Sequence, residues 1–443
     1  METKLSYYCF KPHLRILRRC GYYKIDGNAP EIQKVFHTVY RRLVFGLLTL
    51  YITQQCMKVY QVRNNSVQVM DTLFLCLTNT NTLIKVYILW VRAPLIEELL
   101  AIMKGPLFNQ GLPSHDELLR ATCRHAYRFL RFFQCLPLST VVLWTVYPVV
   151  LHLRGLHQPF TIWLPFDETV DPQFYIAIAY AWLQVSWVAI GASTADSFIT
   201  FMFVQSKTQI AILRLDLETL VEKSKEVASE KSIEFTTALA LRFKAIMAHY
   251  EEIDTFNKKL QKSFGPVIFI QFLLSGWLLC ATIYHMTGVS IDFVSTVMYL
   301  MCVLWEIFLY CYYGNDLNVE STALLDSAYM MDWEQLPLSQ RRAFIIFKER
   351  LKRPILLLGG GIIPLTNDTF ITVGIQRIDH CLYTLQNTRK LLLEGVHYLR
   401  RYIKVVDYSI TQNRNRADRS IFCVNRVKLC FVYTYSLSLP VHN

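Results

Sequence analysis

The stretch FYIAIAYAWLQVSWVAIGASTADSFITFMFV, residues 174–204, decides the fold of this chain. It is 31 residues long, and Asp196 is its one charged side chain. A helix needs roughly 20 apolar residues to cross a hydrocarbon core of about 30 Å, so this stretch is more than long enough. It predicts a membrane-spanning helix that tilts or runs beyond the bilayer on one side.

Five further apolar stretches surround it in the sequence, at residues 43–59, 67–90, 132–151, 264–284 and 293–313. The whole chain of 443 residues is 53% hydrophobic, which is typical of an integral membrane protein and not of a soluble one. Together these stretches predict an all-α, polytopic membrane protein with at least six spanning helices.

Lysine and arginine are concentrated in every second segment outside these stretches. Counted to Arg353, the segments expected on one side of the membrane hold 31 of these residues, and those on the other side hold 2. Cytoplasmic loops are the ones enriched in Lys and Arg, so the pattern predicts a cytosolic amino terminus. Because the basic residues flank apolar stretches, the net charge of +12 indicates anionic lipid and not nucleic acid as the partner.

The same topology constrains two other features. Asn64 begins an Asn-Asn-Ser sequon that the charge rule places outside the cell, where glycosylation occurs. The segments that hold Cys9 and Cys123 are expected in the cytosol, where thiols stay reduced. The basic, amphipathic segment 9–19 is expected to lie on the inner leaflet.

No pattern of catalytic or metal-ligating residues stands out, so we expect no enzyme, no metal and no cofactor. Ionisable side chains inside spans are more informative, because each costs free energy in hydrocarbon. Lys85, Asp196 and Glu306 all fall toward the predicted cytosolic ends of their spans. They form either a salt-bridged cluster beneath a cavity, or a snorkelling lysine and two acids that hydrogen-bond between helices.

Aromatic side chains gather toward the opposite ends of the second, third and fourth stretches. Few polar groups accompany them, as a site for a small hydrophobic ligand requires. An interfacial aromatic belt is the alternative. The candidate ligand-binding residues are Phe74, Thr78, Trp144, Tyr147, Tyr180, Trp182 and Trp187.

Residues 205–263 continue with apolar side chains at helical spacing and with charges on the other face. This pattern predicts amphipathic helices that project into the cytosol. Their apolar stripes pack either on one another or on a partner subunit. Further along, the run Pro354–Pro364 contains three glycines and no phosphate-binding lysine, so we expect a turn that returns the chain to the membrane. A seventh span is expected to begin near Phe370.

With seven candidate spans and an inside amino terminus, the chain resembles insect odorant receptors, whose topology is inverted relative to G-protein-coupled receptors. The resemblance covers about residues 10–373 and is most specific in 308–372. It rests on the Tyr313–Asn315 run, on the spacing of Ser321, Tyr329 and Trp333, and on the apolar run before Pro364. In the fourth span, Asp196 followed by Gln209 and Leu213 also resembles the family.

This resemblance implies an odorant-gated, non-selective cation channel of four subunits, with the pocket among spans two, three, four and six. The long insertion that marks the shared co-receptor is absent, so the resemblance implies a ligand-tuning subunit that forms a heterotetramer with that co-receptor. The expected location is the plasma membrane of a sensory neuron dendrite. Residues assigned to the subunit anchor are Asp196, Gln209, Tyr329 and Trp333, and those assigned to the pore are Ile371, Val373 and Ile375.

The resulting organisation divides the chain into seven parts. They are a cytosolic arm (1–42), spans one to four with the odorant pocket (43–204), cytosolic anchor extensions (205–263), spans five and six (264–313), an anchor helix and turn (314–369), an altered seventh helix (370–387) and an atypical basic tail (388–443).

The last two parts depart from the family. From Arg377 onward the chain carries 11 Lys and Arg residues, which an odd number of spans would place outside the cell. This contradicts the charge rule. Either the seventh helix does not cross, or the carboxyl terminus comes from an altered transcript or a mistaken gene model, and we favour the second explanation. A gustatory receptor channel and a seven-helix G-protein-coupled receptor are the alternative functions.

Overall fold

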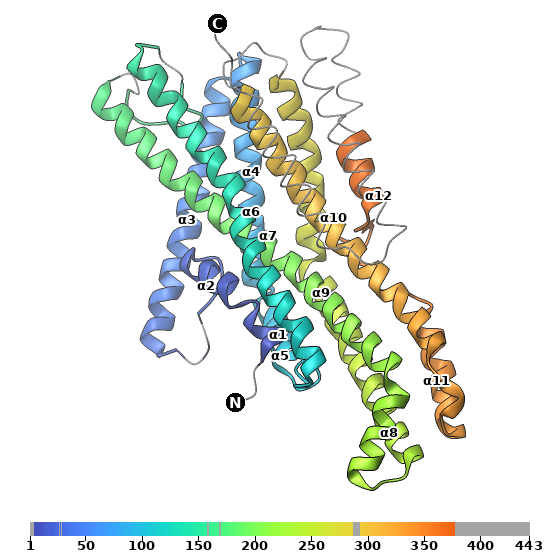
Figure 1. Cartoon of the computed structure of the whole chain (residues 1–443). Helices are drawn as coiled ribbons and strands as arrows, with labels where there is room; N and C mark the ends of the chain where they lie inside the picture. The colour runs from blue at the N-terminus through green and yellow to red at the C-terminus, as the bar shows by residue number, and fades with distance from the viewer. Residues whose placement is uncertain are drawn as a thin grey trace, which may run out of the picture. The chain divides into compact units, whose positions relative to one another are not determined.

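The computed structural model describes residues 4–376 except 26, 28, 157–158, 168–169 and 287–292, and the statements below concern these residues (Figure 1). The remainder of the predicted seventh helix and the basic tail lie outside them. The long helices are α3 (Glu31–Gln61), α4 (Ser66–Val91), α6 (Pro113–Leu153), α7 (Asp171–Glu218), α9 (Phe235–Met286) and α10 (Phe293–Met330). The shorter elements are α1 (Leu5–Tyr8), α2 (Lys11–Arg19), α5 (Ala93–Lys104), α8 (Leu220–Lys231), α11 (Leu338–Leu351), α12 (Asn367–Phe370), the 3-10 turn η1 (Trp333–Gln335), the π-helical turn η2 (Ile371–Gln376), β1 (Leu358–Gly359) and β2 (Ile363–Pro364).

Five of the described helices are long and apolar enough to cross a membrane: α4, α6, α7, α9 and α10. They contain the second to sixth of the apolar stretches found in the sequence. The first stretch lies in α3, a continuous helix of 31 residues that is not among the five. Gln54, Gln55 and Lys58 reduce its apolar character near one end. The chain is thus a polytopic, helical membrane protein, as predicted.

Helix α7 lies at the centre of the bundle and packs against α6, α9 and α10 (Figure 1). Between Ser193 and Asp216 nearly every residue is buried. A helix segment buried on all sides requires neighbours on every side, and this part of α7 has them. The second half of the stretch that predicted a membrane helix, residues 193–204, is therefore also part of the core of the fold.

The apolar stripes beyond α7 find partners within the same chain. Phe243, Ile253 and Phe256 of α9 are fully buried. The ring of Phe243 lies 6.1 Å from that of Phe344 in α11. Of the two predicted packing modes, contact within one chain accounts for these residues. Ile345 and Ile346 on the same α11 remain 59% and 72% exposed and are free to meet a partner.

The amino-terminal arm also packs differently from its prediction. The apolar face of α2, with Leu14 and Leu17, is buried in contact with α7 instead of facing a lipid surface. His13 is fully buried, and its Nε2 lies 2.9 Å from Ser197 Oγ of α7. The basic residues of α2 supplied an amphipathic signal, but a lipid surface and a protein groove satisfy such a face equally well.

Cys9 and Cys123 form a disulfide bond, which differs from the expectation that both stay reduced. Helix α1 packs against α6, and this contact brings the Cα atoms of the two cysteines to 4.5 Å from each other. The two residues are 114 positions apart, so no local pattern in the sequence could indicate this proximity.

Burial makes the docking of the arm sensitive to pH. It lowers the pKa of His13 from 6.5 to about 4, and the backbone hydrogen bond with Cys9 only partly opposes this. The undocked imidazole therefore binds a proton as the pH falls below 6.5, whereas the docked imidazole stays neutral until the pH reaches about 4. Docking should be complete above pH 6.5 and weaken as the pH falls toward 4. Hydrogen exchange of the α2 amides should accelerate between pH 7.5 and 5, after correction for intrinsic rates. The variant H13F should not show this acceleration, and an unchanged pH response in H13F would contradict the assignment.

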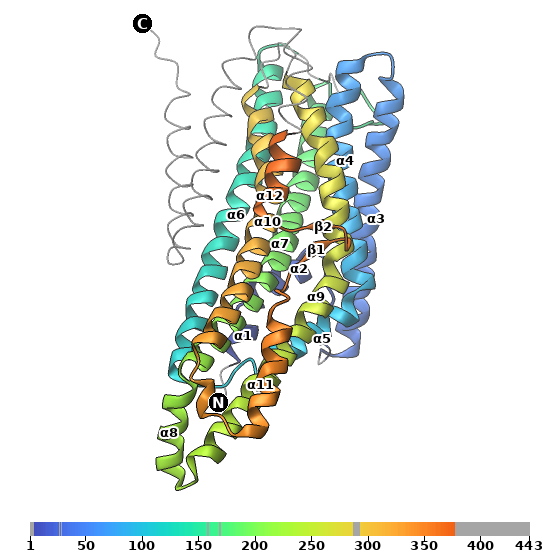
Figure 2. The ribbon, with the colours of Figure 1, turned by 90° about the vertical axis from the view of Figure 1, so that its right-hand side faces the viewer.

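The glycine-rich run forms a β-hairpin docked on α9 (Figure 2). Gly360 and Gly361 at its tip have φ of 63° and 76°, values that residues with a Cβ rarely adopt. The hairpin is joined to α9 by the bond from Gly360 N to Gly265 O, 2.8 Å. After it, Thr366 caps the start of α12 by accepting from Thr369 N, so a helix does begin where the seventh span was expected.

The end of this segment also approaches α10 closely. A Cβ on Gly314 of α10 would lie 2.6 Å from Leu365 Cβ and 2.7 Å from the backbone oxygen of Leu365. Only a residue without a side chain fits at this contact. Figure 2 shows α12 beside α10 just beyond it.

Candidate ligand-binding cavities

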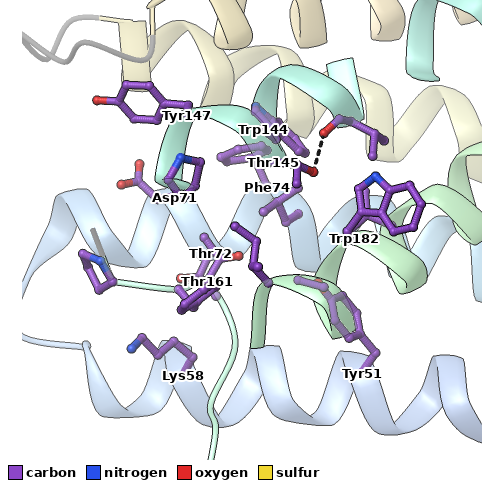
Figure 3. A pocket seen from close by; sticks show the side chains of 18 of the residues that line it. Tyr51, Lys58, Asp71, Thr72, Phe74, Trp144, Thr145, Tyr147, Thr161 and Trp182 are labelled. Atoms are coloured by element: carbon purple, nitrogen blue, oxygen red, sulfur yellow. Dashed lines mark hydrogen bonds between the residues drawn. The ribbon is translucent and has the colours of Figure 1, made fainter. Parts of the chain in front are cut away.

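The larger of two neighbouring cavities, here called the Trp182 cavity, has a volume of about 300 Å³. Its wall comes from α3, α4, α6, α7 and the segment 159–161 (Figure 3). Aromatic and aliphatic side chains dominate, with a few polar ones. Those used below are Tyr51, Phe74, Leu75, Val141, Trp144, Tyr147, Trp182 and Val185.

An aromatic cluster stands at the base of this cavity. The rings of Phe74 and Trp144 meet edge to face at 5.9 Å, and Figure 3 shows them projecting toward each other from α4 and α6. Tyr299 of α10 stacks on Trp144 at 5.6 Å. Such pairs add about 0.5–1.5 kcal/mol beyond their buried area, so the cluster holds three helices together at one level.

Beyond the cluster lies the second cavity, here called the Glu306 cavity, of about 140 Å³. Four residues line both cavities: Leu75, Val141, Trp144 and Val185. The Glu306 cavity is walled by α4, α6, α7, α9 and α10, and its lining includes both Asp196 and Glu306. One set of side chains thus separates a compartment rich in aromatic side chains, which Lys58 and Asp71 also line, from one that contains the Asp196 and Glu306 carboxylates.

The three charged residues singled out in the sequence meet beside this second cavity, so of the two interpretations of the sequence the structure shows the salt-bridged cluster. Lys85 Nζ lies 2.7 Å from Asp196 Oδ1 and also bonds Glu306. The Tyr310 hydroxyl donates to Asp196 Oδ1 at 2.8 Å. The Lys85 and Asp196 side chains are only 3% and 4% exposed. Charges so deeply buried are stable only when they are paired.

Five of the seven candidate ligand-binding residues line a cavity. Phe74, Tyr147 and Trp182 line the first, Thr78 lines the second, and Trp144 lines both.

The other two candidates, Tyr180 and Trp187, lie elsewhere because each has another partner. The Tyr180 hydroxyl donates to Gln54 Oε1 of α3 at 2.8 Å. The Trp187 indole donates to the backbone oxygen of Cys20 at 3.2 Å, just after α2 in the amino-terminal arm. Depth along the helix suggested a cavity for them, but it does not reveal which way a side chain points.

Sequence reasoning overlooked Tyr51 and Tyr299 as part of the cavity walls. Tyr51 lines the Trp182 cavity, and Tyr299 lines the Glu306 cavity. The available signal was weak: each is an aromatic residue within an apolar stretch, one of many in this chain.

The residues assigned to the anchor occupy separate places. Asp196 belongs to the buried charge cluster. Gln209 Nε2 lies 3.2 Å from Ser6 Oγ, and Gln209 Oε1 lies 2.9 Å from His249 Nε2. Tyr329 is 52% exposed and faces Lys348 Nζ at 4.4 Å, and Trp333 stacks on Phe344.

The pore and glycosylation candidates complete the placement. Ile371 and Val373 are half-buried in η2, whereas the side chain of Ile375 lies outside the described residues. Asn64 is exposed in the turn between α3 and α4.

Comparison with known proteins is consistent with this architecture. The chain is 23% identical to Odorant receptor 2a of Drosophila melanogaster over 372 residues, which cover 80% of this chain and 91% of that protein. It is also 23% identical to Odorant receptor 94a of the same organism, over 54% of this chain and 60% of the relative. The match to Odorant receptor 22b spans about half of that relative, 51%.

Solved structures share the fold. The olfactory receptor OR5 from Machilis hrabei superposes with a TM-score of 0.72, covering 86% of this chain and 98% of that one at 16% identity. Its complex with eugenol superposes with a TM-score of 0.71 at 15% identity.

The family model described as 7tm Odorant receptor matches residues 65–374. This range is well over half of the chain and includes all of the helices that line the two cavities except α3. This chain is therefore a member of the insect odorant receptor family.

Proposed function

We propose that this chain is a ligand-tuning subunit of an odorant-gated, non-selective cation channel that acts with the odorant receptor co-receptor. One observation carries the proposal: a largely apolar cavity of about 300 Å³, lined by Phe74, Trp144 and Trp182, within a bundle of membrane helices. A cavity of that size and character suits a small hydrophobic molecule. The related Machilis hrabei receptor has been solved in complex with such a molecule, eugenol.

The subunit lies in the plasma membrane of a sensory neuron dendrite, and the charge distribution supports its orientation there. The amino terminus and the α8–α9 and α11 region, where the basic residues gather, face the cytosol. The anchor between subunits includes the exposed face of α11, with Ile345 and Ile346. The pore includes Ile371 and Val373 of η2.

The decisive experiment is whole-cell recording from cells that express this chain together with the co-receptor, tested with a panel of volatile ligands. A ligand-dependent cation current that requires both chains is expected. Confirmed surface expression of both chains without a current for any ligand would contradict the proposal.

Filling the wall shared by the two cavities should weaken the response to an agonist found in that panel. Val185 lines both cavities, so a phenylalanine there would occupy ligand space in each. The variant V185F is expected to raise the half-maximal concentration at least tenfold with unchanged surface expression. Leu183, two residues away and 62% exposed, provides the matched control, and L183F should respond as the unmodified chain does. Equal loss in both variants would argue against a ligand site at Val185.

Glycosylation provides an independent check of the orientation. Asn64 is exposed in a short turn, and under the proposed topology it faces the lumen during synthesis. A glycosidase should increase the gel mobility of the chain, and the variant N64Q should already migrate at that position.

Cytosolic staining is expected for a tag at Met1. A tag at Met1 that stains on intact cells would instead favour a G-protein-coupled receptor.

A further inference from the structure

The hydrogens of the hydroxyl and thiol groups on the wall of the Glu306 cavity are already used. Four hydroxyls donate to a carbonyl oxygen one turn earlier on their own helix, namely those of Thr78, Thr82, Thr140 and Ser193. A hydroxyl has one hydrogen, so the Tyr299 hydroxyl must donate to Thr78 Oγ1, and the Cys302 thiol to Thr140 Oγ1. These groups can offer a ligand only acceptor lone pairs.

Asn81 adds an acceptor that has no partner. Its side chain lines the cavity, is 5% exposed, and leaves Oδ1 without a hydrogen bond. In the structure Asn81 Nδ2 donates to Gln271 Oε1, and Gln271 Nε2 donates to Ser275 Oγ at 3.1 Å. A buried acceptor left unpaired destabilises the fold, and a ligand with an N–H group would remove that cost.

The charges of the cluster also favour a ligand that carries N–H donors and a positive charge. The cluster holds two carboxylates, those of Asp196 and Glu306, against one ammonium, that of Lys85. Glu306 is the more accessible acid, with its side chain 18% exposed compared with 4% for Asp196. In a medium of low dielectric constant the second carboxylate requires a further positive charge, either a proton or a bound cation.

We propose that the Glu306 cavity binds small primary amines, with the ammonium group between Glu306 and Asn81 Oδ1 and the carbon skeleton against Trp144. This assignment rests on the proposed function, since it takes the cavity to be a ligand site, and it adds the chemical class. An ammonium has three N–H donors, whereas an ester, ketone or ether has none, so these acceptor-only molecules cannot pair with Asn81 Oδ1 and cannot balance the charge of Glu306.

Proton transfer within the cavity balances the charges. An amine that enters as the free base takes the proton that neutralises Glu306. The carboxyl O–H bond breaks, an N–H bond forms on the ligand, and an ammonium–carboxylate pair remains. No other reactant is needed, and the net charge of the cavity does not change.

The size of the cavity identifies a suitable probe. Its volume of about 140 Å³ is close to that of an engineered apolar cavity of roughly 150 Å³ that binds benzene. Benzylamine adds one aminomethyl group to such a ring. Toluene has nearly the same shape and no donor, so the comparison isolates the contribution of the amine.

The test measures dissociation constants of both probes by calorimetry on the purified full-length chain in detergent. The unmodified chain should bind benzylamine at least tenfold more tightly than toluene, a difference of about 1.4 kcal/mol. The variant E306Q keeps an oxygen for Lys85 but removes the charge, and should reduce the ratio to about one with toluene binding unchanged. Glu320 provides the control. It does not line the Glu306 cavity, and its Oε1 lies 2.6 Å from a guanidinium nitrogen of Arg214, so E320Q should retain the full ratio.

Each remaining outcome has a definite meaning. A ratio near one in the unmodified chain, or a full ratio in E306Q, would overturn the amine assignment and leave the odorant cavity intact. If neither probe binds, the Glu306 cavity is not a ligand site and the amine assignment fails, whereas the Trp182 cavity stays the proposed odorant site. The variant N81L serves where E306Q does not fold, and it should reduce the ratio at least threefold.

Discussion

Replacing Lys85 with methionine is expected to leave little folded protein. Its ammonium is the one cation of the buried cluster and bonds both Asp196 and Glu306. Removing one partner of a buried ion pair costs about 3–5 kcal/mol, because a charge remains without compensation. Surface abundance and thermal unfolding of K85M in detergent should both fall sharply.

Two variants make this prediction specific. The double variant K85M/D196N also removes the charge of Asp196 and should recover part of the lost stability. Lys259 forms an exposed pair with Glu98 at the protein surface, and such pairs contribute about 0–1 kcal/mol, so K259M should unfold as the unmodified chain does. Equal unfolding temperatures for K85M and K259M would show that the cluster does not stabilise the fold.

Adding one methyl group at Gly314 should disturb both the packing of the hairpin and the agonist current. In G314A the new Cβ would lie 2.6 Å from Leu365 Cβ and 2.7 Å from a backbone oxygen, so α10 and the end of the hairpin must separate. Overpacking of this kind costs about 1–3 kcal/mol. Because α12 follows directly, we expect faster hydrogen exchange in residues 357–370 and a loss of agonist current with surface expression retained.

Gly46 in α3 is the matched control. It is also helical, but a Cβ there meets nothing within 4 Å. The variant G46A should therefore leave both exchange and current unchanged, and alanine even favours the helix by up to about 1 kcal/mol. Unchanged exchange in G314A would mean that the Leu365 contact does not hold the hairpin in place.

The sequence was sufficient to predict the helices but not their neighbours. Apolar length predicted the helices that contain residues 67–90 and 174–204, because crossing hydrocarbon is a property of one segment. The cost of burying Lys85, Asp196 and Glu306 also made a salt-bridged cluster one of the two interpretations of these residues. Both inferences depend on properties that each segment carries alone.

The sequence could not predict the direction in which each side chain points from its helix. Tyr180 and Trp182 are two residues apart in the same aromatic run, yet Trp182 lines a cavity and Tyr180 bonds Gln54. Likewise, the face of α2 with Leu14 could have met lipid or protein. Only the placement of α3 and α7 decides these cases, and that placement depends on contacts between distant segments.

The side chains shared by the two cavities have a consequence for mixtures of ligands. Trp144 lines both compartments, so a rotation of its ring that enlarges one must encroach on the other. Two molecules bound side by side would then compete for one indole without occupying the same space. Responses to a blend should fall short of the sum of its components, and the shortfall should depend on the bulk of each component more than on its affinity.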